Sequence, residues 1–431
     1  MINTADLRKQ DKEVFMARLR SRSQLARDDI KASVEDIVRD VRDRGDDALL
    51  EYERRFDRVD MAAPDLRVTE EEIDAAYGKV EPRFIEVIRR AAANIRAFHA
   101  KQLEKSWLTS GEGGTMMGQL YRPLERAGIY VPGGRAAYPS SVLMNALPAQ
   151  VAGVECIVMA TPPMEDGSVY PYTLVAAKEA GVGEVYRMGG AQAVAAMAFG
   201  TASVPKVDKI VGPGNIYVAM AKRAVYGYVD IDMIAGPSEI LIIADSSADP
   251  AFVAADLLSQ SEHDPMASAM LITDDEDLAA KVADEVKRQA EELSRRDIIA
   301  QSLEDYGYLI IVNDMKEAVR LANEIAPEHM ELMVAQPFEM LGAIKNAGSI
   351  FLGKYSPEPL GDYMAGPNHV LPTGGTARFY SPLSVDDFIK KSSFIYYSQE
   401  ALASLKNDII DLATFEGLTA HANSVRVRFE K

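Results

Sequence analysis

Apolar residues in the N-terminal part of the chain recur with the spacing of amphipathic helices. Within residues 34–41 they stand at i, i+3, i+4 and i+7, which places them on one face of a helix. Ser33 and Asp36 form a capping-box-like pair that we expect to open this helix, and we expect Gly45 to end it.

Two further helices are predicted before residue 100. Thr69 and Glu72 repeat the capping pattern, and Pro82 suits the first turn of a longer helix because no N–H is needed there. The apolar stripe of this longer helix is expected to comprise Phe84, Val87, Ile88, Ala91, Ile95 and Phe98. Residues 1–25 are predicted to form an N-terminal helical arm.

The pattern changes at about residue 128, where short β-branched runs begin to alternate with alanine-rich helical segments. This alternation is typical of βαβ units and a parallel sheet. Each predicted strand ends in a turn rich in glycine and proline, and these turns are residues 129–134, 157–163, 186–190, 210–215 and 233–239. Because open parallel sheets bind ligands at the carboxyl ends of their strands, we expect a binding site at these turns.

A second alternation of the same kind follows, with the predicted strands EILIIAD, AMLITD, YLIIV and SIFLG. Two such sets predict an α/β protein with two related Rossmann-like lobes. We expect the first lobe, which includes a helical part, to comprise residues 26–128 plus 239–381, and the second to comprise 129–238. Residues 382–431 are predicted to form a helical C-terminal extension.

Composition and charge narrow the class of protein. Of 431 residues, 48% are hydrophobic and 26% are charged, which is typical of a soluble globular chain. The formal net charge of −18 opposes binding to phosphate backbones and anionic lipids, so we expect no nucleic acid and no membrane as partner. The charged N-terminus resembles neither a signal peptide nor a membrane span, which favours a cytoplasmic location.

Several common site motifs are missing from the sequence. It contains neither G-x-G-x-x-G after a strand nor a P-loop, and GEGGTMMG at 111–118 has the spacing of a flexible turn. The single cysteine, Cys156, excludes internal disulfides and CxxC metal sites. Its neighbours are apolar, so we expect an inert core cysteine and no thioester chemistry.

The five histidines can be considered singly. His99 lies beside the apolar stripe of its helix and is predicted to be a packing residue. Gln260 and His263, at i and i+3, project from one face at the end of a predicted helix, which is a weak metal signal on its own. His421, close to the C-terminus, has the surroundings of a solvated tail.

The remaining two histidines stand beside carboxylates. His329 follows Glu328, and Pro327 suits the first turn of a helix, whose N-terminus would favour a neutral imidazole. The neighbouring carboxylate acts in the opposite direction, so the net pKa shift of His329 stays open. Asp362 and His369 lie in a long loop rich in proline and glycine, a setting that is often functional.

Taken together, these segments resemble the histidinol dehydrogenase family, which catalyses the last two oxidations of histidine biosynthesis. The resemblance covers nearly the whole chain beyond residues 1–25. It rests on the joint presence, in this order, of RAGIYVPGGRAAYPSSVLMNALPAQVAGV, GGAQAVAAMAFGT, KIVGPGN, AGPSE, LLSQSEHDP, APEHMEL, SPEPLGDYMAGPNHVLPT and HANSVRVR.

This resemblance implies an oxidoreductase that depends on zinc and NAD and converts L-histidinol through L-histidinal to L-histidine with two NAD. The implied ligands of one zinc ion per site are Gln260, His263, Asp362 and His421. The implied catalytic residues are His329 as general base and Glu328 as activator of water. Water attack at the aldehyde needs no thiol, which agrees with the expected inertness of Cys156.

Further contacts follow from the same resemblance. The substrate contacts would be Ser238, Gln260, His263, His329, Asp362, His369, Glu416 and His421, and the NAD contacts Tyr130, Gln192 and Asn215. The family's Rossmann-like lobes are incomplete, which would explain the missing glycine fingerprint. Its members form domain-swapped homodimers with a shared active site, so the C-terminal extension would reach the partner subunit.

Two alternatives stay open. A related zinc- and NAD-dependent dehydrogenase of another small polyol, such as sulfopropanediol, would share the Glu328–His329 pair but would not need the substrate contacts of His369 and Glu416. A two-lobed solute-binding protein would also use twin βαβ lobes around a cleft. Such proteins usually carry an export signal.

Overall fold

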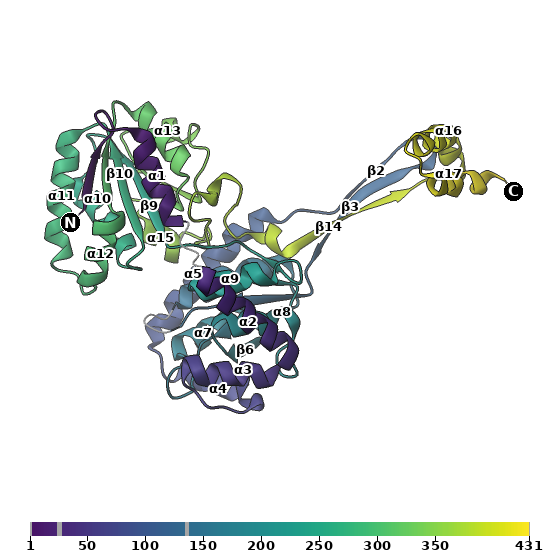
Figure 1. The fold of residues 1–431 in the computed structure, drawn as a ribbon, viewed down its shortest axis with the longest axis horizontal. Helices are drawn as coiled ribbons and strands as arrows, with labels where there is room; N and C mark the ends of the chain where they lie inside the picture. Colours follow the sequence, from purple (N-terminus) through teal and green to yellow (C-terminus); the bar gives the residue numbers. More distant parts are fainter. Residues whose placement is uncertain (1, 24–27, 134–137, 431) are drawn as a thin grey trace. The chain divides into compact units, whose positions relative to one another are not determined.

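The computed structural model describes residues 2–23, 28–133 and 138–430. Residues 134–137, which include the end of the first predicted strand-end turn, lie outside this part, as do residues 1, 24 and 25 of the predicted arm. The chain divides into two compact units. The first unit comprises Met1–Gln102 and Leu124–Phe388, and the second comprises Leu103–Pro123 and Ile389–Lys431 (Figure 1).

The first unit contains a six-stranded sheet in which every neighbouring pair is parallel. The strand order is β1-β11-β10-β9-β12-β13. The strands are β1 (Asn3–Asp6), β9 (Glu239–Ala244), β10 (Ser268–Thr273), β11 (Tyr308–Ile311), β12 (His329–Met333) and β13 (Ser349–Leu352).

Helices cover both faces of this sheet, because alternate residues of its strands point to opposite sides. In β9, Leu241 and Ile243 belong to one core and Ile240 and Ile242 to another. The first core includes residues of α1 (Lys12–Ser23) and α13 (Met315–Ile325). The second includes residues of α10 (Pro250–Ser261), α11 (Glu276–Ala290) and α12 (Arg296–Tyr306).

A five-stranded parallel sheet forms the rest of the first unit's framework, in the order β6-β5-β4-β7-β8. Its strands are β4 (Arg126–Tyr130), β5 (Cys156–Thr161), β6 (Glu184–Arg187), β7 (Lys209–Val211) and β8 (Asp230–Ile231). One core joins this sheet to α2 (Asp28–Arg44), α3 (Asp46–Tyr52), α8 (Gly190–Phe199) and α9 (Ile216–Val225).

The remaining helices of the first unit are shorter or lie around these layers. They are α4 (Glu70–Tyr77), α5 (Pro82–His99), α6 (Pro139–Ala152), α7 (Pro171–Ala180), α14 (Pro337–Leu341) and α15 (Glu358–Tyr363), with the π-helical turn η1 (Glu53–Asp57). Short 3-10 turns are η2 (Ala63–Leu66), η3 (Ala100–Gln102), η5 (Thr376–Arg378) and η6 (Val385–Phe388).

The second unit is a three-stranded antiparallel sheet in the order β14-β3-β2, followed by two helices that pack on each other. Its elements are β2 (Trp107–Ser110), η4 (Glu112–Gly114), β3 (Met116–Pro123), β14 (Ile389–Tyr396), α16 (Gln399–Phe415), α17 (Thr419–Arg426) and η7 (Val427–Phe429). The first part of the string GEGGTMMG forms the turn between β2 and β3, and its last three residues belong to β3.

Many sequence predictions are confirmed. The chain is an α/β protein with two parallel sheets, and Thr69 caps α4 in a complete capping box with Glu72. Helix α5 begins at Pro82, and Gly45, with φ of 60°, follows the last residue of α2. Among the described residues, no helix is long and apolar enough to cross a membrane.

Four predictions about elements are wrong. Helix α2 begins at Asp28, so Ser33 lies inside it and does not cap it. The N-terminal segment starts with a strand, β1, whose backbone pairs with the edge strand β11. The C-terminal extension has the expected helices, α16 and α17, but a strand precedes them, β14, which pairs with β3. Phe98, expected on the buried stripe of α5, is 39% exposed.

One further difference concerns the helical part. We expected residues 26–128 to accompany the 239–381 lobe. The apolar stripe of α2 instead packs against α8 and α9 of the five-stranded sheet, because these alanine-rich helices leave room for its valines and isoleucine.

Candidate active site

The start of strand β12, which lies between β9 and the edge strand β13, positions the Glu328–His329 pair. His329 is the first residue of β12 and pairs with Ile240 of β9 on one side and Ser349 of β13 on the other. The prediction of a helix start at this point is therefore wrong. The pair lies at the amino edge of the sheet, whereas strand-end binding would have placed it at the carboxyl edge.

His329 is buried and neutral, with one ring nitrogen unused. Its Nδ1 lies 3.0 Å from the backbone oxygen of Glu239, which can only accept, so Nδ1 carries the proton. Nε2 is buried without a hydrogen-bond partner among the described residues. Burial lowers the pKa of His329, against the opposite effect of Asp362, which resolves the sign that the sequence left open. Nε2 can therefore accept a proton.

Glu328 is fixed by the same segment of β9. Its Oε2 accepts a hydrogen bond of 2.8 Å from the backbone N–H of Glu239. Burial raises the pKa of Glu328 well above its usual value, and the nearby carboxylates of Asp362 and Glu358 act in the same direction. A raised pKa makes the ionised form of this carboxyl group a stronger proton acceptor.

Helix α15 brings two more carboxyl groups to His329. Nε2 of His329 lies 3.9 Å from both Glu358 Oε1 and Asp362 Oδ1. Burial, followed by the charge of Asp362, raises the pKa of Glu358 to about 9. Ligand atoms of His329, Glu358 and Asp362 all lie within 4.8 Å of one another, so this group could hold a metal ion.

The end of α10 lies against α15. The Ser259 hydroxyl donates to Glu358 Oε2 at 3.2 Å. The next residue, Gln260, is 1% exposed, and its Oε1 has no partner among the described residues. His263, half-buried just after α10, is near enough for its charge to lower the pKa of His329 and His369. The structure thus brings Gln260 and His263 to the region of the pair.

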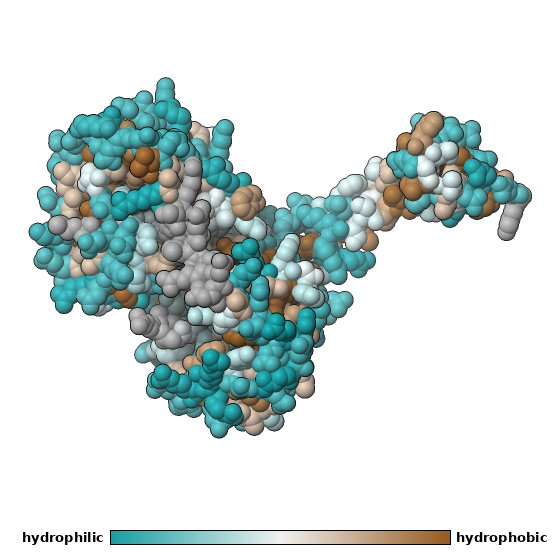
Figure 2. Space-filling view, viewed as in Figure 1, coloured by the Kyte–Doolittle hydropathy of each residue, from teal (hydrophilic) through white to brown (hydrophobic). Residues whose placement is uncertain are grey.

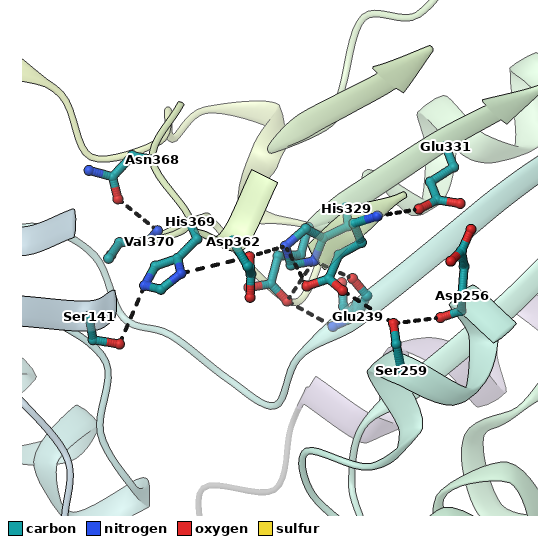
Figure 3. A network of polar contacts seen from close by, with 12 residues as sticks. Ser141, Glu239, Asp256, Ser259, His329, Glu331, Asp362, Asn368, His369 and Val370 are labelled. Atoms are coloured by element: carbon teal, nitrogen blue, oxygen red, sulfur yellow. Dashed lines mark hydrogen bonds and ion pairs between the residues drawn. The ribbon is translucent and has the colours of Figure 1, made fainter. Parts of the chain in front are cut away.

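His369 completes this cluster from the long loop after α15. Its Nδ1 lies 3.7 Å from Asp362 Oδ1, and its Nε2 lies 3.3 Å from the hydroxyl of Ser141 in α6. Figure 3 shows Asp362 between His369 and His329. The loop is fixed by buried Asn368, whose amide donates to the backbone oxygen of Met144. Burial lowers the pKa of His369.

Ser238 directly precedes β9 and is half-buried, and its backbone oxygen accepts from Ser268. It therefore lies at the same amino edge as Glu328. Glu416 and His421 belong to the second unit, where both side chains are exposed. Their part in the site stays a prediction.

A layer of buried acids behind α15 was missed by sequence reasoning. Glu331 in β12 is 1% exposed and accepts from the backbone N–H of Glu358 at 2.8 Å. Its carboxyl group faces that of Asp256 in α10, and burial raises the pKa of Asp256 to about 6. The signal in the sequence was a glutamate among the apolar residues Met330, Leu332 and Met333.

The three predicted NAD contacts gather at the carboxyl edge of the five-stranded sheet, as the strand-end turns led us to expect. The hydroxyl of Tyr130 in β4 accepts from the backbone N–H of Gly190 at 3.1 Å. Gln192 lies two residues further on in α8. Asn215 follows β7, the neighbour of β4, and its side chain caps α9 by accepting from Tyr217 and Val218.

One histidine and the cysteine have structural settings. His99 is fully buried, and its Nδ1 lies 2.7 Å from Oε1 of Gln102, as expected of a packing residue. Cys156 is half-buried at the amino end of β5, opposite the edge that carries Tyr130, and it packs against the core of the five-stranded sheet.

The donor set fits a divalent metal ion. Gln260 Oε1, His329 Nε2 and His369 Nδ1 are buried atoms without hydrogen-bond partners among the described residues, and the buried carboxyl groups of Glu328 and Glu358 belong to the same region. Nitrogen and oxygen donors of this kind suit zinc. The predicted ligand set and the group around His329 share only Asp362.

Comparisons with known proteins agree along the full chain. The sequence model of one protein family, described as "Histidinol dehydrogenase", matches residues 20–429. The histidinol dehydrogenase of Caldanaerobacter subterraneus subsp. tengcongensis is 59% identical over 429 residues, which are 100% of this chain and 99% of that protein. The one of Clostridium acetobutylicum is 56% identical over 97% of each chain. The crystal structure of histidinol dehydrogenase from Elizabethkingia anophelis has a TM-score of 0.91 at 38% identity and covers 100% of this chain and 98% of that one.

Proposed function

We propose a mechanism from the premise that this chain belongs to the histidinol dehydrogenase family and is an oxidoreductase of histidine biosynthesis. The proposed reaction is the oxidation of L-histidinol through L-histidinal to L-histidine with two NAD and one zinc ion per site. One observation carries it: His329 is buried, which lowers its pKa, its Nε2 has no partner in the described part of the chain, and Glu328 stands beside it.

Zinc would be held by Gln260, His263 and Asp362, with His421 of a second copy as the fourth ligand. It would supply a Lewis acid that orients the imidazole and amine of the substrate. Oε1 of Gln260, which has no hydrogen-bond partner among the residues that the structure describes, supports this choice. His329 is left out of the ligand set, because a nitrogen bound to metal could not accept a proton.

His329 would act in the first oxidation. Its Nε2 would accept the proton of the substrate hydroxyl while a hydride leaves the carbon that bears this hydroxyl. The hydrogen bond from Nδ1 to the backbone oxygen of Glu239 holds the ring in place. In the second oxidation Glu328 takes a proton from water as the water oxygen adds to the aldehyde carbon. A second hydride then leaves, and the product is the carboxylic acid.

NAD would supply the hydride acceptor in both steps. Tyr130, Gln192 and Asn215 are proposed to hold it at the carboxyl edge of the five-stranded sheet. Ser238, His369 and Glu416 are the remaining proposed substrate contacts.

A homodimer with a shared active site is part of the proposal. Glu416 and His421 are exposed in the second unit, and Phe415 beside them is 86% exposed. Figure 2 shows hydrophobic side chains gathered at the place of α16 and α17. Apolar surface of this kind is typical of a protein–protein interface. The proposal includes no nucleic acid and no membrane as partner. The proposed location is cytoplasmic.

Substrate comparison tests this function directly. The zinc-loaded protein should form NADH from L-histidinol and none from sulfopropanediol. Turnover of sulfopropanediol without turnover of histidinol would favour the related polyol dehydrogenase. Ligand binding that persists without metal, together with no turnover of either substrate, would favour a solute-binding protein.

A further inference from the structure

A pair of carboxyl groups lies beneath the turn between β6 and α8, outside the residues considered so far. Glu53 and Asp57 are the first and last residues of η1, a single π-helical turn after α3. Glu53 is completely buried, and Asp57 is half-buried. Burying a glutamate side chain costs folding free energy unless its carboxyl oxygens are hydrogen-bonded.

Glu53 binds the start of α8. Its Oε1 accepts from the backbone N–H of Gly189 at 3.1 Å and from the side-chain Nε2 of Gln192 at 3.0 Å. Oδ2 of Asp57 lies 3.5 Å from the same Nε2. Glu53 thus binds a backbone N–H at the start of α8, where helical hydrogen bonds are missing, and both acids contact the side-chain amide of Gln192.

These contacts define which way the Gln192 amide faces. Carboxylate oxygens accept hydrogen bonds, so the NH2 group of Gln192 turns toward the pair and its carbonyl oxygen turns away. The carbonyl oxygen lies against Gly190, where an added Cβ would come within 2.7 Å of it. The backbone N–H of Gly190 is itself bound to Tyr130. Two of the three proposed NAD contacts are therefore joined through this turn.

The pKa values of the two acids are both shifted by their surroundings. Burial, followed by the charge of Asp57, raises the pKa of Glu53 well above its usual value, and burial also raises the pKa of Asp57. The charge of Asp57 acts on Glu53, and Glu53 Oε2 is buried without a hydrogen-bond partner among the described residues, so the protonated form of Glu53 is favoured. Glutamine at position 53 would imitate the protonated form.

We propose that Glu53 and Asp57 are positioning residues for the cofactor: they hold the Gln192 amide in one orientation, with its carbonyl oxygen toward the NAD site, and so set the affinity for NAD. The inference rests on the proposed function, because only there is Gln192 an NAD contact. Neither acid is expected to touch the reacting atoms.

Direct binding of NAD to the zinc-loaded protein, measured by calorimetry without substrate, tests the proposal. Glu53→Ala should weaken NAD binding about tenfold, the effect of one lost hydrogen bond to a charged or polar group. Zinc content and histidinol affinity should stay unchanged. Glu53→Gln should bind NAD within about threefold of the parent protein, because it keeps the acceptor for Gln192. Glu51→Gln, on the exposed face of α3, is the matched control.

A double-mutant cycle separates positioning from a merely structural role. If Glu53 acts through Gln192, then Glu53→Ala should change NAD affinity by less than about twofold in a Gln192→Ala background. Asp57→Ala, which removes the acceptor oxygen that lies 3.5 Å from Nε2 of Gln192, provides a second route if Glu53→Ala fails to fold, with NAD binding weakened and the zinc content kept.

The failures are distinguishable. A full tenfold effect of Glu53→Ala in the Gln192→Ala background would overturn the inference, as would unchanged NAD binding in folded Glu53→Ala. If Gln192→Ala alone leaves NAD binding intact, then the proposed NAD contact is itself wrong.

Discussion

At the scale of single residues, the chemistry of the site depends on which nitrogen of His329 is free. The backbone oxygen of Glu239 accepts a hydrogen bond from Nδ1–H, and this leaves Nε2, without a proton, facing Asp362 and Glu358. A nitrogen in this position could serve as a base or as a metal ligand. The two roles make different predictions for zinc content.

Replacing His329 distinguishes the two roles. His329→Ala should reduce the first oxidation about 10²- to 10⁴-fold, because a general base is lost, while the zinc content stays at that of the parent protein. His263→Ala, the matched variant at a proposed ligand, should lose zinc and activity together. Metal analysis and NADH formation measure both. If His329→Ala loses zinc, the metal site would instead be the group formed by His329, Glu358 and Asp362.

The buried acid Asp256 predicts a pH dependence of stability. Its pKa in the folded protein is raised by burial from 3.8 to about 6, so the folded state binds an additional proton between these values. The stabilising contribution is fully present below pH 3.8 and is lost as the pH rises through about 6. Asp256→Asn should therefore stabilise the protein by on the order of 1 kcal/mol more at pH 8 than at pH 5.

Thermal unfolding at the two pH values checks this expectation. Asp284→Asn, at an exposed position of α11, should change the midpoint equally at both. An equal change in Asp256→Asn as well would show that this carboxyl group titrates normally.

At the scale of elements, the sequence predicted the strands of the five-stranded sheet and four strands of the six-stranded sheet, β9, β10, β11 and β13, but missed β1 and β12. Turns rich in glycine and proline follow the strands that carry Tyr130 and Asn215, so local signals were sufficient there. Strand β12 was missed because Pro327 resembles a helix start and Glu331 interrupts its apolar run. Only tertiary packing, with β9 and β13 on either side, makes this segment a strand.

Other misses have the same origin in distant contacts. Strand β14 pairs with β3, for example Ser392 with Leu120, and no local pattern reveals such pairing. The amino-edge position of Glu328 and His329 was likewise invisible, since the strand-end rule favours the opposite edge. The resemblance to a family identified the residues, and the structure supplied their hydrogen bonds and burial.

Local capping signals can be tested at the element they open. Thr69→Ala removes the acceptor for the Glu72 N–H at the start of α4 and should lower the free energy of unfolding by about 1 kcal/mol. Activity should not change, because Thr69 is not part of the proposed site. Urea denaturation provides the measurement, with Glu71→Gln in the same exposed turn as the control. Equal stability of the two variants would argue against the cap.

At the scale of the whole molecule, the proposed site needs residues from both units. Gln260 and Asp362 belong to the first unit and His421 to the second. If the fourth ligand comes from another copy, two different inactive chains should complement each other. Mixing His421→Ala with Gln260→Ala should restore about a quarter of the sites when subunits exchange at random, since half the dimers are mixed and each has one intact site.

Size measurement and activity of the mixture check this prediction. The mixture should be dimeric and active, whereas each variant alone should be inactive. A dimeric mixture without activity would place all four ligands in one chain.

The central claim is a metal-dependent oxidation in two steps at one site. The most direct test counts NADH formed from a limiting amount of L-histidinol before and after chelation of zinc. We predict two NADH per histidinol with the metal bound, none after its removal, and recovery when zinc is returned. One NADH per histidinol with accumulation of the aldehyde, or undiminished turnover in the metal-free protein, would contradict it.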